Sequence, residues 1–228
     1  MKYKLSQLMF KKYVDCKYQL PEYNPNADFD WIMNHSGLPW LQLDIVIPYA
    51  TILNEIKNIE SLLEVHRDEY GEHQGWKSFC IHGKSYNATR EESHYNDDRP
   101  YVWTTEAQQG MPLTVDYFAN TWPGDQFKRV RVMLLEPGGY VSIHQDSKIS
   151  KLTAVNIAIT QPDDCKFVMA NHGTVPFFPG QAFWLDISNQ HVVINNSDQP
   201  RWHIIVHQSF DNSFQNMVVN SYKKLYNN

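Results

Sequence analysis

The chain has 228 residues, and its Lys and Arg residues (20) are fewer than its Asp and Glu residues (25), which gives a formal net charge of −5 at pH 7. This mildly acidic balance argues against a nucleic-acid partner, and an aromatic content of 14% argues against a disordered chain. The first residues form no apolar signal region, and no run approaches the roughly 20 apolar residues that span a bilayer. Cys16, Cys80 and Cys165 are too sparse for a disulfide framework, so we expect a cytoplasmic protein with no membrane segment.

The N-terminal part of the chain predicts one clear helix. Prolines interrupt the first 48 residues, so no long element is expected there. Between Ile52 and Leu63, apolar residues recur at spacings of three and four, which predicts an amphipathic helix over about residues 49–66. Residues 66–100 are mostly polar, with a possible strand from Trp76 to His82. Long polar segments in compact chains are often functional, so part of this segment is a candidate lid over a site.

From residue 127 the sequence changes to short alternating runs separated by turn residues. Strands are predicted at residues 130–135, 140–146, 152–160, 165–169, 181–186, 190–194 and 201–208, with a turn at the Pro-Gly-Gly sequence of residues 137–139. Such a series without intervening helices is typical of a sandwich or jelly roll. A last helix is predicted after Asp211-Asn212, which can serve as its cap.

We therefore expect a single domain over residues 1–228. It consists of a helical and irregular part over residues 1–100, a β core over residues 101–208 and a C-terminal helix over residues 209–228.

Two of the predicted strands have a polar face and an apolar face. Strict alternation puts Tyr140, Ser142, His144 and Asp146 on one side of their strand, opposite Val141 and Ile143; on the next strand it puts Ala154, Asn156 and Ala158 opposite Val155, Ile157 and Ile159. We expect the branched apolar faces to lie in a core. The small polar face is either a wet sheet surface or the lining of a ligand site.

The pattern with the most chemical content is His144-x-Asp146 followed by His191. Two histidines and a carboxylate form the facial ligand set of non-haem Fe(II), which leaves positions open for oxygen chemistry. His144 and Asp146 are two residues apart on a predicted strand, so both can face one ion. Either motif alone is common without a metal, but their joint occurrence on predicted strands favours a metal site.

Arg201 follows at the start of the last predicted strand, on the same face as His203, Ile205 and His207. A guanidinium that faces the interior needs an anion, and arginine is suited to a two-point grip on a carboxylate. Arg201 is thus a candidate for binding an organic acid, with a surface charge as the plain alternative.

These residues together resemble a known family. The stretches 131–146, 180–186, 191–197 and 201–206 are similar to those of the aspartyl/asparaginyl β-hydroxylases, which are Fe(II)/2-oxoglutarate-dependent oxygenases and include some free-proline hydroxylases. The resemblance covers about residues 127–208. It implies a mainly β fold with flanking helices, the cupin-like jelly roll called a double-stranded β-helix.

The resemblance also implies roles for individual residues. His144, Asp146 and His191 would bind Fe(II), and Arg201 would bind the distal carboxylate of 2-oxoglutarate. Ser142 and Asn156 are further candidates for cosubstrate binding. The family often has Arg-x-His on the strand after His-x-Asp, whereas this chain has Ala154-Val-Asn156, so we expect Asn156 to replace that histidine as a polar contact.

The activity that the resemblance implies is hydroxylation of an amino acid or a peptidyl side chain, with O2 consumed and succinate and CO2 as coproducts. Two alternatives stay open: a catalytically silent jelly-roll binding module, and a metal-dependent cupin lyase or isomerase that needs no keto acid. The sequence does not identify the substrate. Arg129 and Arg131 are candidates for contacting a substrate carboxylate, with surface charges as the alternative.

Overall fold

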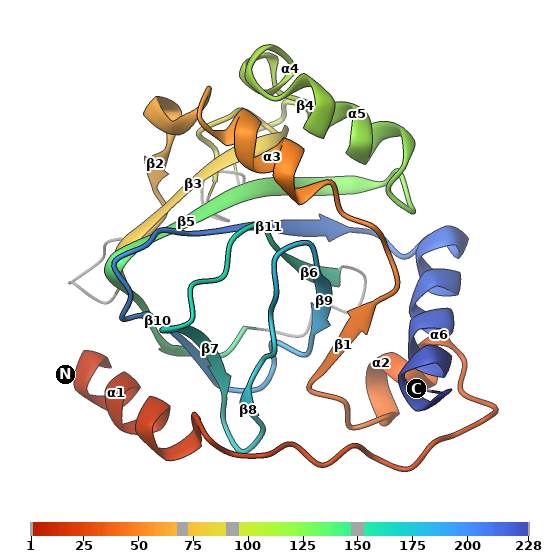
Figure 1. Ribbon diagram of the computed structural model, residues 1–228. Coiled ribbons are helices and arrows are strands. Elements are labelled where there is room, and N and C mark those ends of the chain that lie inside the picture. Colours follow the sequence, from red (N-terminus) through yellow and green to blue (C-terminus); the bar gives the residue numbers. More distant parts are fainter. Residues whose placement is uncertain (1, 68–72, 90–95, 147–152, 228) are drawn as a thin grey trace.

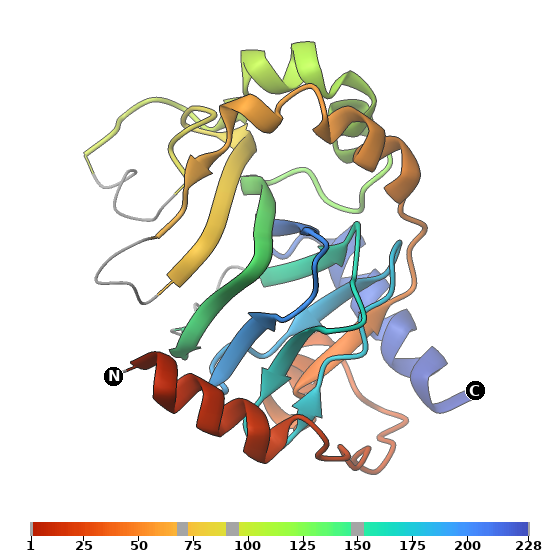
Figure 2. The same ribbon diagram turned by 60° about the vertical axis from the view of Figure 1, so that its left-hand side comes forward.

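The computed structural model describes residues 2–67, 73–89, 96–146 and 153–227. Within these ranges the chain is mostly β, with a curled sheet in the middle and helices on its outside (Figures 1 and 2). None of the helices in these ranges is long and apolar enough to cross a membrane. All three cysteines are free.

One long strand, β5 (Phe127–His144), organises the sheet. Its first half pairs with β11 (Arg201–Gln208), and its second half pairs with β10 (His191–Asn195). The first wall continues through β6 (Thr153–Ala158), β9 (Ala182–Leu185) and β1 (Trp40–Leu43), and the second wall continues through β7 (Cys165–Met169) and β8 (Gly173–Thr174). These pairs are all antiparallel.

The two walls face each other because β5 passes from one to the other. This is the double-stranded β-helix, so the predicted fold class is confirmed. β3 (His73–Gly83) adds to the free edge of β5 and in turn pairs with the short strands β2 (Glu64–Val65) and β4 (Val102–Trp103).

Helices cover the outside of both walls (Figure 1). They are α1 (Lys2–Tyr13), α2 (Phe29–His35), α3 (Tyr49–Ile56), α4 (Thr105–Gly110), α5 (Pro112–Asn120) and α6 (Asn212–Asn227). α1 lies against β5, β7 and β10 of the second wall, and α6 lies against β1 and α2 at the edge of the first wall. As predicted, the terminal helix begins beside Asp211, whose carboxylate accepts a hydrogen bond from the backbone N–H of Phe214 (2.8 Å).

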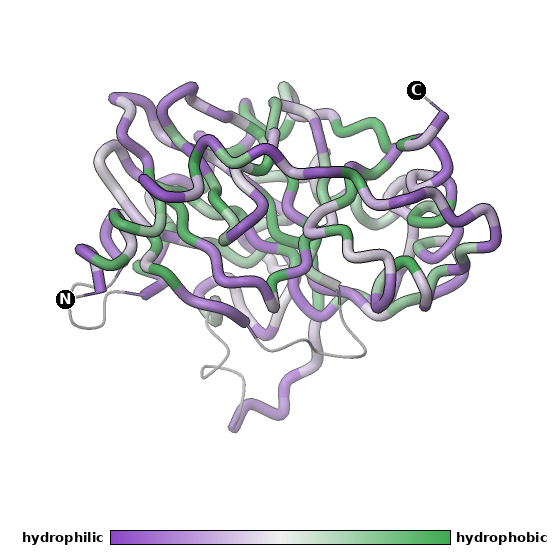
Figure 3. The backbone as a smooth tube through the Cα atoms, turned by 90° about the horizontal axis from the view of Figure 1, so that it is seen from below, coloured by the Kyte–Doolittle hydropathy of each residue, from purple (hydrophilic) through white to green (hydrophobic). Residues whose placement is uncertain are grey.

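Alternation along the strands separates a core under the helices from the inside of the barrel. Val155, Ile157 and Ile159 pack in the core under the helices, as expected. Ala158 faces the other way and packs with Phe183 and side chains of the second wall, including Val193. In Figure 3 hydrophobic and hydrophilic stretches change over within short segments, as expected for elements with one buried face.

The helix predicted over residues 49–66 is much shorter in the structure. α3 ends at Ile56 and is followed by a turn and a 3-10 helix, Glu60–Leu62. Ile59 is fully buried against Gly110, where an added Cβ would lie 2.6 Å from Ile59 Cγ2. The amide of Asn58 also donates to the carbonyl of Gly110 (2.9 Å). These contacts with the end of α4 compete with continuation of the helix.

The turn predicted at residues 137–139 is a bulge inside one continuous strand. β3 pairs Gln74 with Tyr140 and Trp76 with Leu135, so residues 136–139 lie opposite Gly75. A Cβ on Gly75 would lie 3.0 Å from Cβ of Glu136, so this close crossing favours glycine. The bulge lets β5 change walls without leaving the sheet.

Candidate metal centre

His144 and His191 lie opposite each other on paired strands. They are Cα partners in the β5–β10 ladder, and their ring centroids are 4.2 Å apart. Asp146 follows two residues after His144, and its backbone N–H donates to the carbonyl of Ile187 (3.0 Å), which fixes the start of this loop. Its Oδ2 lies 4.0 Å from Nε2 of each histidine.

The three side chains offer ligand atoms that all lie within 4.8 Å of one another. Small side-chain rotations would therefore bring them onto one ion. Two imidazole nitrogens and one carboxylate oxygen are the facial triad of non-haem iron, so these residues fit Fe(II). The structure brings together the three residues that the sequence pattern singled out.

Backbone carbonyls fix the outer nitrogen of each histidine. Nδ1 of His144 lies 2.6 Å from the carbonyl of Ser142, and Nδ1 of His191 lies 2.9 Å from that of Asn189. A carbonyl only accepts, so each Nδ1 carries a proton and each Nε2 keeps a free lone pair. Burial, with the charge of His144 as a second cause, lowers the pKa of His191 to about 4. The neutral ring that a metal requires is thus the resting form at neutral pH.

Ser142 is buried beside this centre, and its hydroxyl has no hydrogen-bond partner among the residues that the structure describes. Its backbone N–H donates to Nδ1 of His73 (3.2 Å), and the ring of His73 meets that of His144 edge to face at 6.0 Å. His73 comes from the polar segment 66–100, in which we assigned no site residue. The residues next to His73 in the sequence do not indicate that it lies beside this centre, because β3 brings it there from a distant part of the chain.

The strict alternation predicted for residues 140–146 is wrong. The β5–β10 register shifts between the pairs His191–His144 and Val193–Val141, which marks a bulge at the second half of β5. Tyr140 and Ile143 pack on the outer side against Met9 of α1, whereas Val141 packs inside the barrel. An extra residue in one strand reverses the alternation beyond it.

Arg201 faces the inside of the barrel and is held by neutral groups. Its Nε donates to Oε1 of Gln161 (3.3 Å), and its Nη2 donates to Nδ1 of His203 (3.0 Å). The guanidinium carbon also lies 5.6 Å from the ring centroid of Phe177. Among the described residues, no carboxylate pairs with Arg201. Burial lowers its pKa to about 10, so the side chain stays charged at neutral pH.

Asn156 is buried on the inner face of β6, between Phe183 of β9 and Ile205 of β11 in the ladder. Its amide makes no hydrogen bond to any described residue. A buried amide ordinarily has a partner, so Asn156 and Ser142 both offer polar atoms that a bound molecule can satisfy.

Arg129 and Arg131, the candidates for contacting a substrate carboxylate, are buried, so the alternative of two surface charges is wrong. They lie on the face of β5 opposite Val130 and Val132, which pack under the helices, and they pair in the ladder with His207 and Ile205. Nη1 of Arg131 donates to the carbonyl of Thr89 (2.6 Å), so the described end of the candidate lid reaches this arginine. Residues 68–72 and 90–95 of that segment lie outside the described residues.

Comparisons with known proteins agree with this geometry. The family model described as aspartyl/asparaginyl beta-hydroxylase matches residues 48–209. A search of curated proteins found no match.

The solved structures with a similar fold have low sequence identity to this chain. A prolyl-4-hydroxylase from Pseudomonas putida is 15% identical over 80% of this chain and 97% of its own, with a TM-score of 0.46. An oxidoreductase of the 2OG-Fe(II) oxygenase family from Burkholderia pseudomallei is 13% identical over 87% and 98%, with a TM-score of 0.49. A prolyl hydroxylase from Trichoplax adhaerens, in complex with a hypoxia inducible factor peptide, is 12% identical over 86% and 91%, with a TM-score of 0.47. The functional argument therefore depends on the family match and on the site.

Proposed function

Because the chain belongs to the aspartyl/asparaginyl β-hydroxylase family, we propose that it is an Fe(II)/2-oxoglutarate-dependent dioxygenase that hydroxylates an amino acid or a peptidyl side chain. Family membership indicates an oxygenase-type hydroxylase. The nature of the substrate and the roles of individual residues are our proposal.

One observation carries the proposal: the same barrel contains a complete facial triad and a buried cation that has no carboxylate partner among the described residues. His144 lies at the end of β5, and Arg201 pairs with Leu135 on the same strand. Phe177 lies between the two regions, because it contacts Arg201 and also packs against Phe167 (centroids 6.2 Å apart), which stacks on His191 (5.1 Å). A keto acid with a distal carboxylate suits a site with a metal at one end and a guanidinium at the other.

Each group has a distinct task in this proposal. Iron(II), when bound, supplies the activation of O2 coupled to decarboxylation of the keto acid to succinate and CO2. His144, Asp146 and His191 would hold the ion through two imidazole nitrogens and one carboxylate oxygen. Arg201 orients the cosubstrate, and the rings of Phe167 and Phe177 exclude water around it. Part of the polar segment 66–100, which reaches Arg131 through Thr89, is proposed to close over the substrate.

The test is succinate release from 2-oxoglutarate under O2 with Fe(II). Free proline, aspartate, asparagine, arginine and lysine are screened first, followed by short peptides. We expect slow release by the enzyme alone, faster release with a substrate, and a gain of one oxygen atom in the product mass.

The alternatives give different results in the same assay. Keto-acid binding without any succinate release would support the silent binding module. Conversion of a panel compound without keto acid would support a cupin-type lyase or isomerase. Stimulation by peptides alone would assign a peptidyl substrate.

A further inference from the structure

In the described part of the chain Arg201 has no carboxylate partner, and its contacts suggest a reason. We propose that Gln161 and His203 are positioning residues that hold Arg201 ready for one carboxylate while leaving its charge uncompensated. This inference rests on the proposed function, in which that carboxylate is the distal one of 2-oxoglutarate.

The three side chains form a closed ring of hydrogen bonds. Oε1 of Gln161 accepts from Nε of Arg201 (3.3 Å) and lies 3.1 Å from Nε2 of His203, while Nδ1 of His203 lies 3.0 Å from Nη2 of Arg201. An arginine only donates, so Nδ1 of His203 accepts and Nε2 carries the ring proton. The side-chain nitrogen of Gln161 donates to the carbonyl of Cys165, which fixes the orientation of the amide.

This ring uses one edge of the guanidinium. A guanidinium has five N–H donors, and the ring engages the one on Nε and one on Nη2. The remaining donors are on Nη1 and on the other side of Nη2. Two parallel N–H groups of this kind suit a bidentate carboxylate. The ring therefore leaves Arg201 with one prepared edge for one carboxylate.

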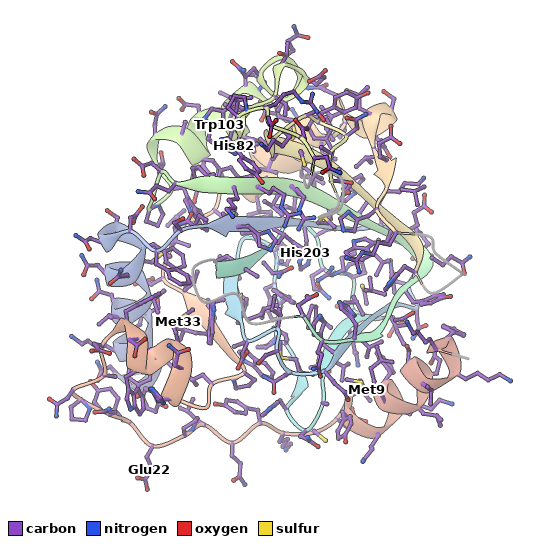
Figure 4. The ribbon with its side chains drawn as sticks, turned by 180° about the vertical axis from the view of Figure 1, so that it is seen from behind. Met9, Glu22, Met33, His82, Trp103 and His203 are labelled. Carbon is purple, nitrogen blue, oxygen red and sulfur yellow. The ribbon has the colours of Figure 1, made fainter. Side chains whose placement is uncertain are left out.

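The partners of Arg201 carry no compensating charge. His203 is fully buried inside the barrel (Figure 4), and burial, with Arg201 as a second cause, lowers its pKa well below the usual range. Burial raises the pKa of the neighbouring Cys165 thiol to about 11, so it is neutral as well. Gln161 is an amide with no charge. A glutamate at position 161 would offer the same accepting oxygen and would also neutralise the guanidinium.

That comparison separates a positioning role from a structural one. If Gln161 only supported the fold, Gln161→Glu, which can form a buried ion pair, should preserve keto-acid binding at least as well as Gln161→Met, which removes the accepting oxygen. A residue that holds Arg201 for an external carboxylate gives the reverse order, because the glutamate would compete with the ligand for the same cation.

The experiment measures binding, not turnover. Protein loaded with redox-silent Mn(II) is titrated with 2-oxoglutarate by calorimetry, and thermal unfolding is recorded in parallel. We expect Gln161→Glu to weaken keto-acid binding by more than ~30-fold and Gln161→Met by only ~3–10-fold, while Mn(II) binding is unchanged in both. Gln199→Glu, which adds the same charge at an exposed position two residues before Arg201, should bind as wild type does.

Two results would overturn the inference about Gln161 and His203 without contradicting the proposed function. One is keto-acid binding by Gln161→Glu that is as tight as wild type, and the other is an order of affinities that follows the order of thermal stability. His203→Phe gives a second check, since loss of its accepting nitrogen should also weaken binding.

Other results of the same titration would contradict the proposed function. If wild type bound glutarate, a plain dicarboxylate, but not 2-oxoglutarate, the carboxylate site would remain and the dioxygenase proposal would fall. If wild type bound neither acid, both would fall.

Discussion

His144 and His191 are direct Cα partners across the β5–β10 pair, and each presents Nε2 at 4.0 Å from the same oxygen of Asp146. The register of two strands therefore sets the separation of two ligands, while the third comes from the loop that follows β5. Two ligands on a hydrogen-bonded ladder move little relative to each other. We infer that this pair is the rigid part of the metal centre and that Asp146 adjusts to the ion.

We predict that His144→Ala and His191→Ala each abolish stoichiometric Fe(II) binding, because each removes one of three ligands. Metal content after anaerobic loading and desalting measures this, and succinate release should be lost in parallel. His35→Ala, at an exposed position in the last turn of α2, is the control and should keep its metal. Undiminished iron in both site variants would refute the assignment.

Arg201→Ala should separate cosubstrate binding from metal binding. A buried charge-assisted pair with a ligand carboxylate is worth roughly 2–5 kcal/mol when one partner is removed. We therefore expect 2-oxoglutarate affinity to fall by more than about tenfold, while iron content stays near that of wild type. Lys224→Ala, which removes an exposed lysine that pairs with Asp44, should change neither. If titration shows normal keto-acid affinity in Arg201→Ala, another cation binds the acid.

His82 predicts a pH dependence of stability outside the metal centre. It is buried beside Trp103 (ring centroids 4.7 Å apart; Figure 4), and burial lowers its pKa to about 4, with a backbone contact at Lys128 acting in the opposite direction. The unfolded chain takes up a proton near the ordinary histidine pKa of about 6.5. The stabilisation from a neutral His82 is therefore complete above that pH and is lost as the pH falls from about 6.5 towards 4.

The measurement is urea unfolding of metal-free protein at pH 7.5 and 5.0. Other buried histidines contribute to the total, so the comparison is with His82→Phe, whose loss of unfolding free energy over this interval should be smaller than that of wild type by up to about 2 kcal/mol. The exposed variant His35→Gln should behave as wild type does. Equal losses in wild type and His82→Phe would show that His82 does not titrate on unfolding in this range.

Two glycines with positive φ provide a matched test of the fold. Gly173 (φ +97°) packs so closely on the backbone of Cys16 that an added Cβ would lie 2.1 Å from its carbonyl oxygen, whereas a Cβ on Gly138 (φ +71°) would meet nothing within 4 Å. Gly138→Ala should cost only the backbone strain of about 1–2 kcal/mol. Gly173→Ala should cost at least about 2 kcal/mol more, because backbone must move. Equal losses of unfolding free energy in the two variants would show that the segment after α1, which contains Cys16, can move aside without a cost in stability.

The sequence predicted the strands of the barrel better than the helices around it. Half-buried antiparallel strands alternate with a period of two and end at turn residues, and β11 was predicted with its observed bounds of Arg201–Gln208. Helices α1, α2, α4 and α5 were not predicted. Two of them carry local signals, since Asp28 and Thr104 cap the starts of α2 and α4 through backbone N–H groups. α2 and α4, with seven and six residues, are too short for their periodicity to be recognised without such caps.

The site could be predicted only where residue type and local spacing determine it. His144, Asp146 and His191 are recognisable because the chemistry requires those side chains and because His144 and Asp146 are only two residues apart in the sequence. Gln161 and His203 were missed, because their role depends on hydrogen bonds with Arg201, which lies 40 residues after Gln161 and two residues before His203. The face on which Tyr140 lies was misjudged, because a bulge depends on the partner strand and leaves no simple trace in the alternation.

Asn156 remains a prediction as a polar contact to the bound acid, and the prediction is testable because its amide has no hydrogen bond to any described residue. Asn156→Leu keeps the volume of the side chain and removes a buried polar group that has no partner among the described residues. If a ligand satisfies the amide, this variant should bind 2-oxoglutarate about 3–10-fold more weakly, since one hydrogen bond is lost. Its ligand-free form should unfold at the same free energy as wild type or a higher one, because burying an amide that lacks a partner among the described residues is costly. Ala154→Val, on the same face of β6, is the steric control. A variant that loses stability while keeping its keto-acid affinity would show that Asn156 serves the fold, and a liganded structure in which the amide turns away from the bound acid would lead to the same conclusion.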